Sequence, residues 1–265
     1  MKVALIQMDS TENINQNMEK ASKFIMQAVK QNVDTICLPE NFLYAGGKVD
    51  KSFEIESADI KVFRELANIN NVNIILGSIK IKEKGEDKPT NTTLVLNRNG
   101  EVIHRYDKIY MYTVNRHDLQ IDESKNTKRG QKAGIFELEG IKVGIGICFD
   151  IRFPEYFREL TLQGAELIFL PANFRKTTGL LAWEHLTKAR AIENQVYFCA
   201  CCQTGGTELK QRCGNSSIIS YKGEVLSNIE IEEGIIITDI NIEELRQYRR
   251  EIPALEQAIE IKKEL

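Results

Sequence analysis

Residues 141–154 read IKVGIGICFDIRFP, and this stretch places a cysteine where a buried strand passes into a helix. Branched apolar side chains occupy alternate positions of its first half, as in a buried strand: Ile141, Val143, Ile145 and Ile147. The glycines between them, Gly144 and Gly146, predict that another element packs closely against that face. Pro154 is typical of the first residue of a helix. We therefore expect Cys148 to lie at a turn that lifts its side chain clear of the sheet.

A cysteine at such a turn has two interpretations. Many free cysteines are small buried hydrophobic residues with no chemical role. A thiolate can also attack an electrophilic carbon, and the backbone N–H groups that follow the turn would then point at the group it attacks. The position alone does not decide between packing and catalysis, so the other residues must.

Length and composition predict an ordinary globular protein. The 265 residues are 42% hydrophobic and 28% charged, with a net charge of −3, and no linker is visible, so we expect one domain over residues 1–265. The absence of a long basic run argues against nucleic acid as a partner. No apolar run approaches the length of a membrane span, and no signal peptide precedes the strand pattern at residues 2–6. We expect a cytoplasmic protein that does not bind membranes.

Six cysteines are scattered along the chain: Cys37, Cys148, Cys199, Cys201, Cys202 and Cys213. In a chain of this size they do not resemble a disulfide framework. Residues 199–202 contain a C-x-x-C spacing, but it lies in an apolar run and no second ligand pair follows. Core packing is the favoured interpretation of this run, and a metal or redox site is the alternative. We expect the protein to need no metal and no other cofactor.

Apolar patterns alternate between strand and helix periods along the chain, which predicts an α/β fold with mixed sheets. Helices are predicted at residues 13–31, 59–69, 154–163, 181–194 and 242–250. Strands are predicted at residues 2–8, 33–38, 72–79, 92–96, 101–104, 135–138, 141–147, 167–170, 196–202, 217–220, 224–226 and 235–240. Residues 112–129 are polar and irregular, and we expect a surface loop there that could cover a site.

Two segments of the chain resemble each other. Residues 31–42 read QNVDTICLPENF and residues 163–174 read QGAELIFLPANF, with Gln, Ile, Leu, Pro, Asn and Phe in register. Chance similarity of two strand ends is possible, but an internal repeat that builds two related sheets is the favoured interpretation. In this register Glu40 corresponds to Ala172. The shared turn therefore does not need the carboxylate, which makes Glu40 a candidate for chemistry.

Three reactive side chains follow predicted strand ends: Glu40, Lys108 and Cys148. Residues just past strand C-termini converge in open α/β sheets. A carboxylate could take the thiol proton and later protonate a leaving amine. An ammonium group and the N–H of Phe149 could stabilise the oxyanion that forms when the thiolate attacks. Each residue also has an ordinary structural interpretation, as a strand end, a salt bridge or a core thiol.

Three motifs in order, LPE at 38–40, YDK at 106–108 and GICFDIRFPE at 146–155, resemble those of the nitrilase superfamily of carbon–nitrogen hydrolases. Residues 183–184, 189–195 and 252–253 are also similar to that family, so the resemblance covers nearly the whole chain. It implies an α-β-β-α sandwich with two mixed sheets, and commonly a homodimer or a higher homo-oligomer. It also implies that Glu40 is the general base, Lys108 the oxyanion stabiliser and Cys148 the nucleophile. Glu123, in an Asp-Glu-Ser sequence, matches a second glutamate that is often found between the lysine and the cysteine.

Within the superfamily the chain is most similar to ω-amidases and deaminated-glutathione amidases, which hydrolyse an amide on a carboxylate-bearing molecule. It departs from them at Lys108-Ile-Tyr110, at Gly214-Asn-Ser216 and in residues 114–119. These differences leave the substrate open. Asn173 lies at the end of the second copy of the repeat, and Arg175 and Lys176 follow it, near the predicted catalytic rim. A guanidinium group can bind both oxygens of a carboxylate, so we expect Arg175, with Lys176, to bind the substrate, and Arg116 is the alternative.

The preferred interpretation is thus a cysteine amidase that releases ammonia through a thioester. Nitrile and N-carbamoyl hydrolysis remain alternatives, since they use related chemistry at the same thiol. A catalytically silent binding or regulatory protein on the same fold is the alternative from another class. A Cys–His hydrolase is not favoured, because His104, His117 and His185 lie in no recognisable motif.

Overall fold

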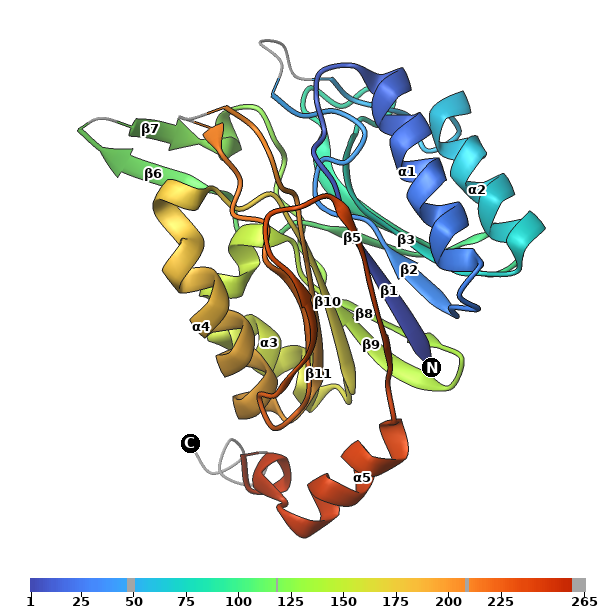
Figure 1. Cartoon of the computed structure of the whole chain (residues 1–265). Helices are drawn as coiled ribbons and strands as arrows, with labels where there is room; N and C mark the ends of the chain where they lie inside the picture. The colour runs from blue at the N-terminus through green and yellow to red at the C-terminus, as the bar shows by residue number, and fades with distance from the viewer. Residues whose placement is uncertain (47–50, 118, 208–209, 259–265) are drawn as a thin grey trace.

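The computed structural model describes residues 1–46, 51–117, 119–207 and 210–258. Two β-sheets pack face to face, and helices cover the outer face of each sheet (Figure 1). The helices of the outer layers are α1 (Ile14–Val29) and α2 (Ala58–Asn70) on the first sheet, and α3 (Pro154–Leu162) and α4 (Lys176–Asn194) on the second. The expected α-β-β-α sandwich is therefore confirmed.

The first sheet has six strands and includes the last strand of the chain at one edge. Its spatial order is β14 (Gly234–Asp239), β1 (Lys2–Gln7), β2 (Thr35–Cys37), β3 (Asn73–Ile81), β4 (Thr90–Leu96) and β5 (Val102–Asp107). Strands β1, β2 and β3 are parallel, and the other neighbours are antiparallel. The sheet is therefore mixed, as expected.

The second sheet repeats this plan. Its spatial order is β8 (Gly134–Leu138), β9 (Ile141–Ile145), β10 (Leu167–Ala172), β11 (Tyr197–Cys202), β12 (Ser216–Ile219) and β13 (Val225–Ile229). Strands β9, β10 and β11 are parallel, and the other neighbours are antiparallel. The two sheets thus share strand order and direction, with β2 and β10 at equivalent positions. This agreement supports the internal repeat inferred from residues 31–42 and 163–174.

Alternation along the strands builds two cores. On β1, Ala4 and Ile6 belong to the cluster between the first sheet and α1 and α2. Val3 and Leu5 belong to the cluster that joins the first sheet to the second. All four side chains are buried. A period of two therefore gives each strand one face for the helices and one for the other sheet.

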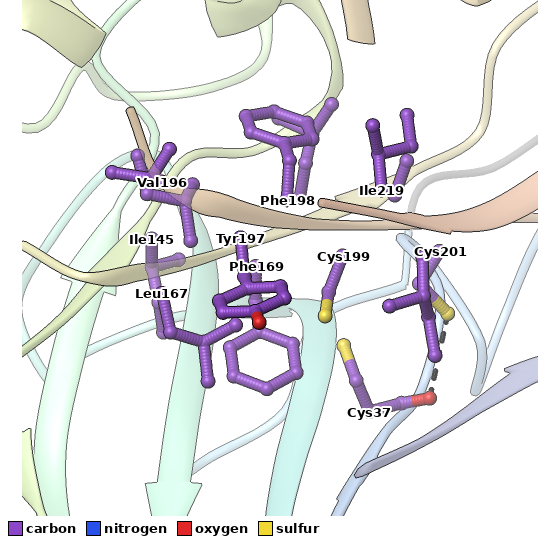
Figure 2. Packing of buried hydrophobic residues seen from close by; sticks show 14 of the residues in the cluster. Cys37, Ile145, Leu167, Phe169, Val196, Tyr197, Phe198, Cys199, Cys201 and Ile219 are labelled. Carbon is purple, nitrogen blue, oxygen red and sulfur yellow. Dashed lines mark hydrogen bonds between the residues drawn. The ribbon is translucent and has the colours of Figure 1, made fainter. Parts of the chain in front are cut away.

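Cys199 and Cys201 of β11 belong to the core between the sheets. Cys199 and Cys201 point toward Cys37 of the first sheet, whereas Phe198 points to the opposite side of the strand (Figure 2). The Cys201 thiol donates a hydrogen bond to the carbonyl of Cys37 at 3.4 Å. Cys202 is also buried, with its Sγ atom 3.6 Å from that of Cys213. These contacts support core packing as the role of the C-x-x-C run.

Gly144 of β9 and Gly146, just after it, make the close contacts that the sequence predicted. A Cβ atom on Gly144 would lie 3.0 Å from Leu160, and one on Gly146 would lie 3.0 Å from Phe157, both on α3. The strand itself ends at Ile145, earlier than expected. A 3₁₀ helix, η2 (Cys148–Arg152), replaces the short turn, and Pro154 then begins α3.

Residues 112–129 are more regular than expected. They contain a two-stranded hairpin, β6 (Thr113–Arg116) and β7 (Leu119–Asp122), followed by a 3₁₀ helix, η1 (Glu123–Lys125). Its cross-strand pairs include Val114 with Ile121, and its side chains are mostly exposed or half-buried. Because the hairpin projects from the sandwich (Figure 1), it lacks the apolar alternation of a buried strand.

Helix α4 begins at Lys176 rather than at Leu181. Its first turn lacks the apolar spacing that marks the rest of the helix, so periodicity did not detect it. Gly179 lets this turn lie against the ring of Phe174, because a Cβ atom there would come within 2.1 Å of the ring. Arg175 is therefore the residue that precedes a helix, and it does not lie within a loop.

Helix α5 (Ile242–Glu251) follows β14 and lies beyond the end of the sheets (Figure 1). Arg246 pairs with Glu166 at 2.6 Å, and Arg249 donates to the carbonyl of Ala165 at 2.8 Å. These contacts fix the helix against the start of β10. Within the ranges that the structure describes, no helix is both long and apolar enough to cross a membrane.

Candidate active site

Cys148 is the first residue of η2 and has a φ angle of +48°. This left-handed conformation is strained for a residue with a side chain, and it persists only where the surroundings enforce it. The enforcement comes from Asp150, whose carboxylate accepts hydrogen bonds from the N–H of Ile147 at 2.7 Å and the N–H of Tyr110 at 2.9 Å. Tyr106 donates a third bond at 2.7 Å. Burial raises the pKa of Asp150 to about 6, although Lys108 and the backbone N–H groups oppose it.

Glu40 follows β2 and Pro39, and its side chain is buried. One carboxylate oxygen accepts hydrogen bonds from Lys108 Nζ at 3.1 Å and Asn91 Nδ2 at 2.9 Å. The other accepts from the N–H of Asn173 at 2.8 Å, which comes from the opposite sheet. Gln203 also donates to the Glu40 carbonyl, at 2.6 Å. Contacts from both sheets therefore hold this carboxylate in place.

Lys108 follows β5 and is almost completely buried. Its ammonium group lies between two carboxylates, 3.1 Å from Glu40 Oε1 and 2.9 Å from Glu123 Oε2. Burial opposes the charged form, but Glu123 and Glu40 outweigh it and hold the pKa of Lys108 well above its ordinary value. Lys108 is therefore a fixed cation at neutral pH.

Glu123 enters the site from η1, at the base of the β6–β7 hairpin. Besides Lys108, its carboxylate accepts hydrogen bonds from the N–H of Tyr112 at 2.9 Å, Lys80 Nζ at 3.3 Å and Asn91 Nδ2 at 3.2 Å. Burial alone would raise the pKa of Glu123, but Lys108 and Lys80 lower it to about 2. The side chain is therefore ionised across the ordinary pH range.

The thiol of Cys148 faces this group of charges. Burial and the charge of Glu40 raise its pKa well above the ordinary value, while Lys108 and the N–H of Asn173 act in the opposite direction. The resting site therefore holds a neutral thiol beside an ionised lysine. Such a thiol needs a base to become a nucleophile, and Glu40 is the carboxylate beside it.

These side chains border a cavity of about 380 Å³. Phe149, Asn173 and Arg175 also line it, whereas Lys176 is exposed and Arg116 lies on β6, and neither of them is a lining residue. The basic side chains that line the cavity are Lys80, Lys108, Arg152, Arg175, Lys210 and Arg212, and the acidic ones are Glu40, Asp122 and Glu123. The cavity thus combines a compact group of reactive residues with a positively charged rim.

The sequence did not single out three polar residues of this site: Lys80, Asn91 and Asp150. A signal existed for the first two, because Lys80 interrupts the apolar strand β3 and Asn91 lies on β4, whose residues are all buried. Asp150 lies within the cysteine motif itself. Their partners depend on strand register and on the turn at Cys148, which sequence patterns do not determine. Within the described residues, no three His, Cys, Asp or Glu side chains are grouped as a metal site.

The site brings together a buried cysteine, Cys148, a buried carboxylate, Glu40, and a buried lysine, Lys108, where the two sheets meet. This arrangement defines a class of enzyme. The family model described as carbon–nitrogen hydrolase matches residues 2–250 of the chain. A deaminated glutathione amidase of Synechocystis sp. is 34% identical over 264 residues, which cover 97% of each chain. An omega-amidase of Mus musculus is 30% identical over 97% of this chain and 94% of its own.

A solved structure supports the same relationship. A nitrilase-superfamily protein of Saccharomyces cerevisiae has a TM-score of 0.86 and 27% identity, over 96% of this chain and 94% of that chain. The chain therefore belongs to the carbon–nitrogen hydrolase family, as its motifs indicated. It is a hydrolase that acts on carbon–nitrogen bonds other than peptide bonds.

Proposed function

We propose that this enzyme is a cysteine-dependent amidase that cleaves the amide of a small carboxylate-bearing molecule and releases ammonia. One observation carries the proposal: Glu40, Lys108 and Cys148 border a single cavity, with Lys108 Nζ 3.1 Å from Glu40 Oε1. The deaminated glutathione amidase and omega-amidase names of the relatives support the substrate class. Deaminated glutathione and an ω-amide acid are both compatible with it, and the assays below distinguish them from nitriles and N-carbamoyl compounds.

The first half-reaction forms a thioester. Glu40 takes the thiol proton as Sγ of Cys148 attacks the amide carbon, and the carbonyl oxygen becomes an oxyanion. The Lys108 ammonium group and the N–H of Phe149 stabilise that oxyanion. Glu40 then gives the thiol proton to the amide nitrogen, and the carbon–nitrogen bond breaks. Ammonia departs, and the acyl group stays bound to the sulfur of Cys148.

The second half-reaction hydrolyses the thioester. Water enters the position that ammonia vacated, and Glu40 takes a proton from it as its oxygen attacks the acyl carbon. The same oxyanion site is used again. Glu40 returns that proton to Sγ of Cys148 as the carbon–sulfur bond breaks, and the carboxylic acid is released. Glu123 contributes by holding Lys108, since its Oε2 atom lies 2.9 Å from the ammonium group.

We propose that Arg175 binds the carboxylate of the substrate. It lines the cavity at the residue before α4, and Asn173, two residues earlier, binds Glu40 through its N–H. A guanidinium–carboxylate pair places the substrate's charged end at the rim and its amide near Cys148. The neighbouring Lys176 is exposed and lies outside the cavity lining, so it provides a matched control.

The experiment measures ammonia release from an ω-amide acid and from its uncharged methyl ester, with a nitrile and an N-carbamoyl acid for comparison. We expect the acid amide to be the best substrate of the wild-type enzyme. Arg175→Gln should raise KM for the acid about tenfold or more with little effect on the ester, because a charge-assisted bond is worth about 1.5–3 kcal/mol. Lys176→Gln should change neither.

An equal response of acid and ester to Arg175→Gln would assign the charge selection to another residue, and Arg152 of the cavity rim would be tested next. Preferential turnover of the nitrile or the N-carbamoyl acid would contradict the proposed reaction class.

We further propose that the enzyme is cytoplasmic and at least a homodimer. All six cysteines are free thiols, which suits a reducing compartment. On the outer helix α4, Leu181 is 80% exposed and Ile192 is 52% exposed, and apolar side chains of this size favour burial against a second copy. Light scattering on the purified protein tests the oligomer, and a monomeric mass would contradict it.

A further inference from the structure

Glu123 contacts a second cation besides Lys108, the half-buried Lys80. Lys80 lies on β3 between Ile79 and Ile81, which are both buried, and its own side chain is 15% exposed. Its ammonium group donates to Glu123 Oε1 at 3.3 Å and to Thr127 Oγ1 at 2.5 Å. A lysine within a buried strand loses hydration, so these two contacts must replace it.

The four donors to Glu123 divide between its two oxygens. Lys80 and Asn91 donate to Oε1, whereas Lys108 and the N–H of Tyr112 donate to Oε2. Lys80 and Asn91 are directly paired across β3 and β4, so strand register places both on the same side of the carboxylate. This arrangement fixes the orientation of Glu123 and leaves Oε2 directed at Lys108.

Within the group joined by direct ion pairs, Glu40, Lys108 and Glu123, the charges balance only when Lys80 is counted. Glu40 and Glu123 are two carboxylates, and Lys108 supplies one positive charge to both, at 3.1 and 2.9 Å. With a neutral thiol, these three residues carry a net charge of −1. Lys80 brings the group to zero. An oxyanion that develops beside Lys108 then meets no excess of negative charge.

We propose that Lys80 is a positioning residue, which fixes Glu123 and balances its charge so that the Lys108 ammonium group can stabilise the oxyanion. The proposal rests on the function proposed above and adds a residue to that site. Lys80 acts through Glu123 and Lys108 and does not bind the substrate carboxylate. Its removal should therefore affect acid and ester substrates alike, unlike the loss of Arg175.

The first test compares Lys80→Met, which removes the charge, with Lys80→Arg, which keeps it. We expect Lys80→Met to lower kcat about tenfold or more for both the ω-amide acid and its methyl ester, because a displaced catalytic group is costly. Lys80→Arg should restore most of kcat. A rise in KM confined to the acid would show that Lys80 binds the substrate and would overturn the proposal. Equal losses in both variants would also overturn it, since charge would then be irrelevant.

The second test is the pH profile of kcat/KM. The titratable and charged side chains that border the cavity with Glu123 are Lys80, Lys108, Arg152, Arg175, Lys210, Arg212, Glu40, Asp122, Cys148 and Tyr112. Loss of the Lys80 charge raises the pKa of Glu123 from about 2, so the acidic limb should begin at a higher pH in Lys80→Met. It should stay in place in Lys80→Arg. An unmoved limb in Lys80→Met contradicts the proposed electrostatic role.

The third test needs no turnover. Cys148 is alkylated with neutral iodoacetamide and with anionic iodoacetate, and the ratio of the two rates reports the potential at the thiol. We expect Lys80→Met to lower the iodoacetate-to-iodoacetamide ratio about tenfold. Thr127→Val, which removes the hydroxyl partner of Lys80, should lower it less and in the same direction, and it replaces Lys80→Met if that variant does not fold. An unchanged ratio overturns the proposal, whereas a wild-type enzyme that releases no ammonia overturns the proposed function instead.

Discussion

Three features of the site around Cys148 prepare it for proton transfer from the thiol. Burial and Glu40 hold the thiol pKa high, so the sulfur keeps its proton in the resting site. Lys108 keeps its own proton because Glu123 and Glu40 outweigh the effect of burial. Glu40 accepts hydrogen bonds at both oxygens. A carboxylate that only accepts is prepared to take the thiol proton when an electrophile arrives.

At the residue scale, we predict that Glu40→Gln and Lys108→Ala each lower kcat by about a thousandfold. One oxyanion donor is worth about 3–4 kcal/mol, and a general base contributes about 10²–10⁴-fold. The double variant should be little worse than either single one, because both residues serve the same step. Steady-state ammonia release measures all three variants, with circular dichroism to check folding. Exposed Lys142 on β9 provides the control, and Lys142→Ala should be fully active. Losses that multiply in the double variant would show that the two residues act independently.

Much of the site at this scale could be predicted from the sequence, because strand ends converge. Glu40, Lys108 and Cys148 each follow a strand, and the structure brings them to one cavity. Lys80 and Asn91 could not be assigned in the same way. Their approach to Glu123 depends on the cross-strand pairing of β3 with β4 and on a hairpin that the sequence pattern did not reveal.

At the element scale, η2 is the part of the fold that presents Cys148, the proposed nucleophile. Its geometry depends on Asp150, which accepts two backbone N–H groups and the hydroxyl of Tyr106. The sequence predicted a turn here but not its length, because a 3₁₀ helix has no apolar period of its own. The start of α4 was missed for a similar reason: its first turn contains Gly179 and polar residues.

Asp150→Asn should therefore lower kcat by about tenfold or more, because the amide nitrogen would face one of the donors. It should also alter the pH dependence of stability. The folded-state pKa of about 6 lies above the ordinary value of 3.8, so this carboxyl group contributes stability that is present below pH 3.8 and is lost as the pH rises through 6. Glu123 changes stability only at lower pH, because its pKa falls from 4.5 to about 2.

Urea unfolding at pH 4.5 and pH 7 measures this effect. The gain in unfolding free energy at pH 4.5 relative to pH 7 should be smaller in Asp150→Asn than in the wild-type protein, by about 2 kcal/mol. The same pH dependence in both proteins would contradict the assignment of the raised pKa to Asp150.

At the scale of the whole molecule, the site lies where the two related sheets meet. Asn173 and Gln203, which follow β10 and β11, both donate hydrogen bonds to Glu40, which follows β2. The repeat in the sequence predicted two related halves, and the shared strand order agrees with it. The sequence could not show that the last strand, β14, completes the first sheet, because that pairing joins residues at opposite ends of the chain.

We predict that residues 1–265 unfold as one domain, because a single cluster of buried side chains joins the first sheet to the second. Leu5→Ala in that cluster should lower the unfolding free energy by about 2–5 kcal/mol. Fluorescence, circular dichroism and residual activity should give coincident urea midpoints in both proteins. Ile69, which is 78% exposed on α2, is the control, and Ile69→Ala should cost less than about 0.5–1 kcal/mol. Different urea midpoints by fluorescence and by circular dichroism would indicate two domains.

The central claim is that Cys148 forms the covalent bond to the substrate, and ammonia release by Cys148→Ala tests it most directly. The variant should be folded, with no detectable turnover of an ω-amide acid that the wild-type enzyme hydrolyses, because no other group can form the thioester. Cys199→Ala removes another buried thiol, from the core between the sheets, and should retain wild-type turnover after a stability loss of about 1–2 kcal/mol. Ammonia release by Cys148→Ala at a rate close to that of the wild-type enzyme would contradict the account.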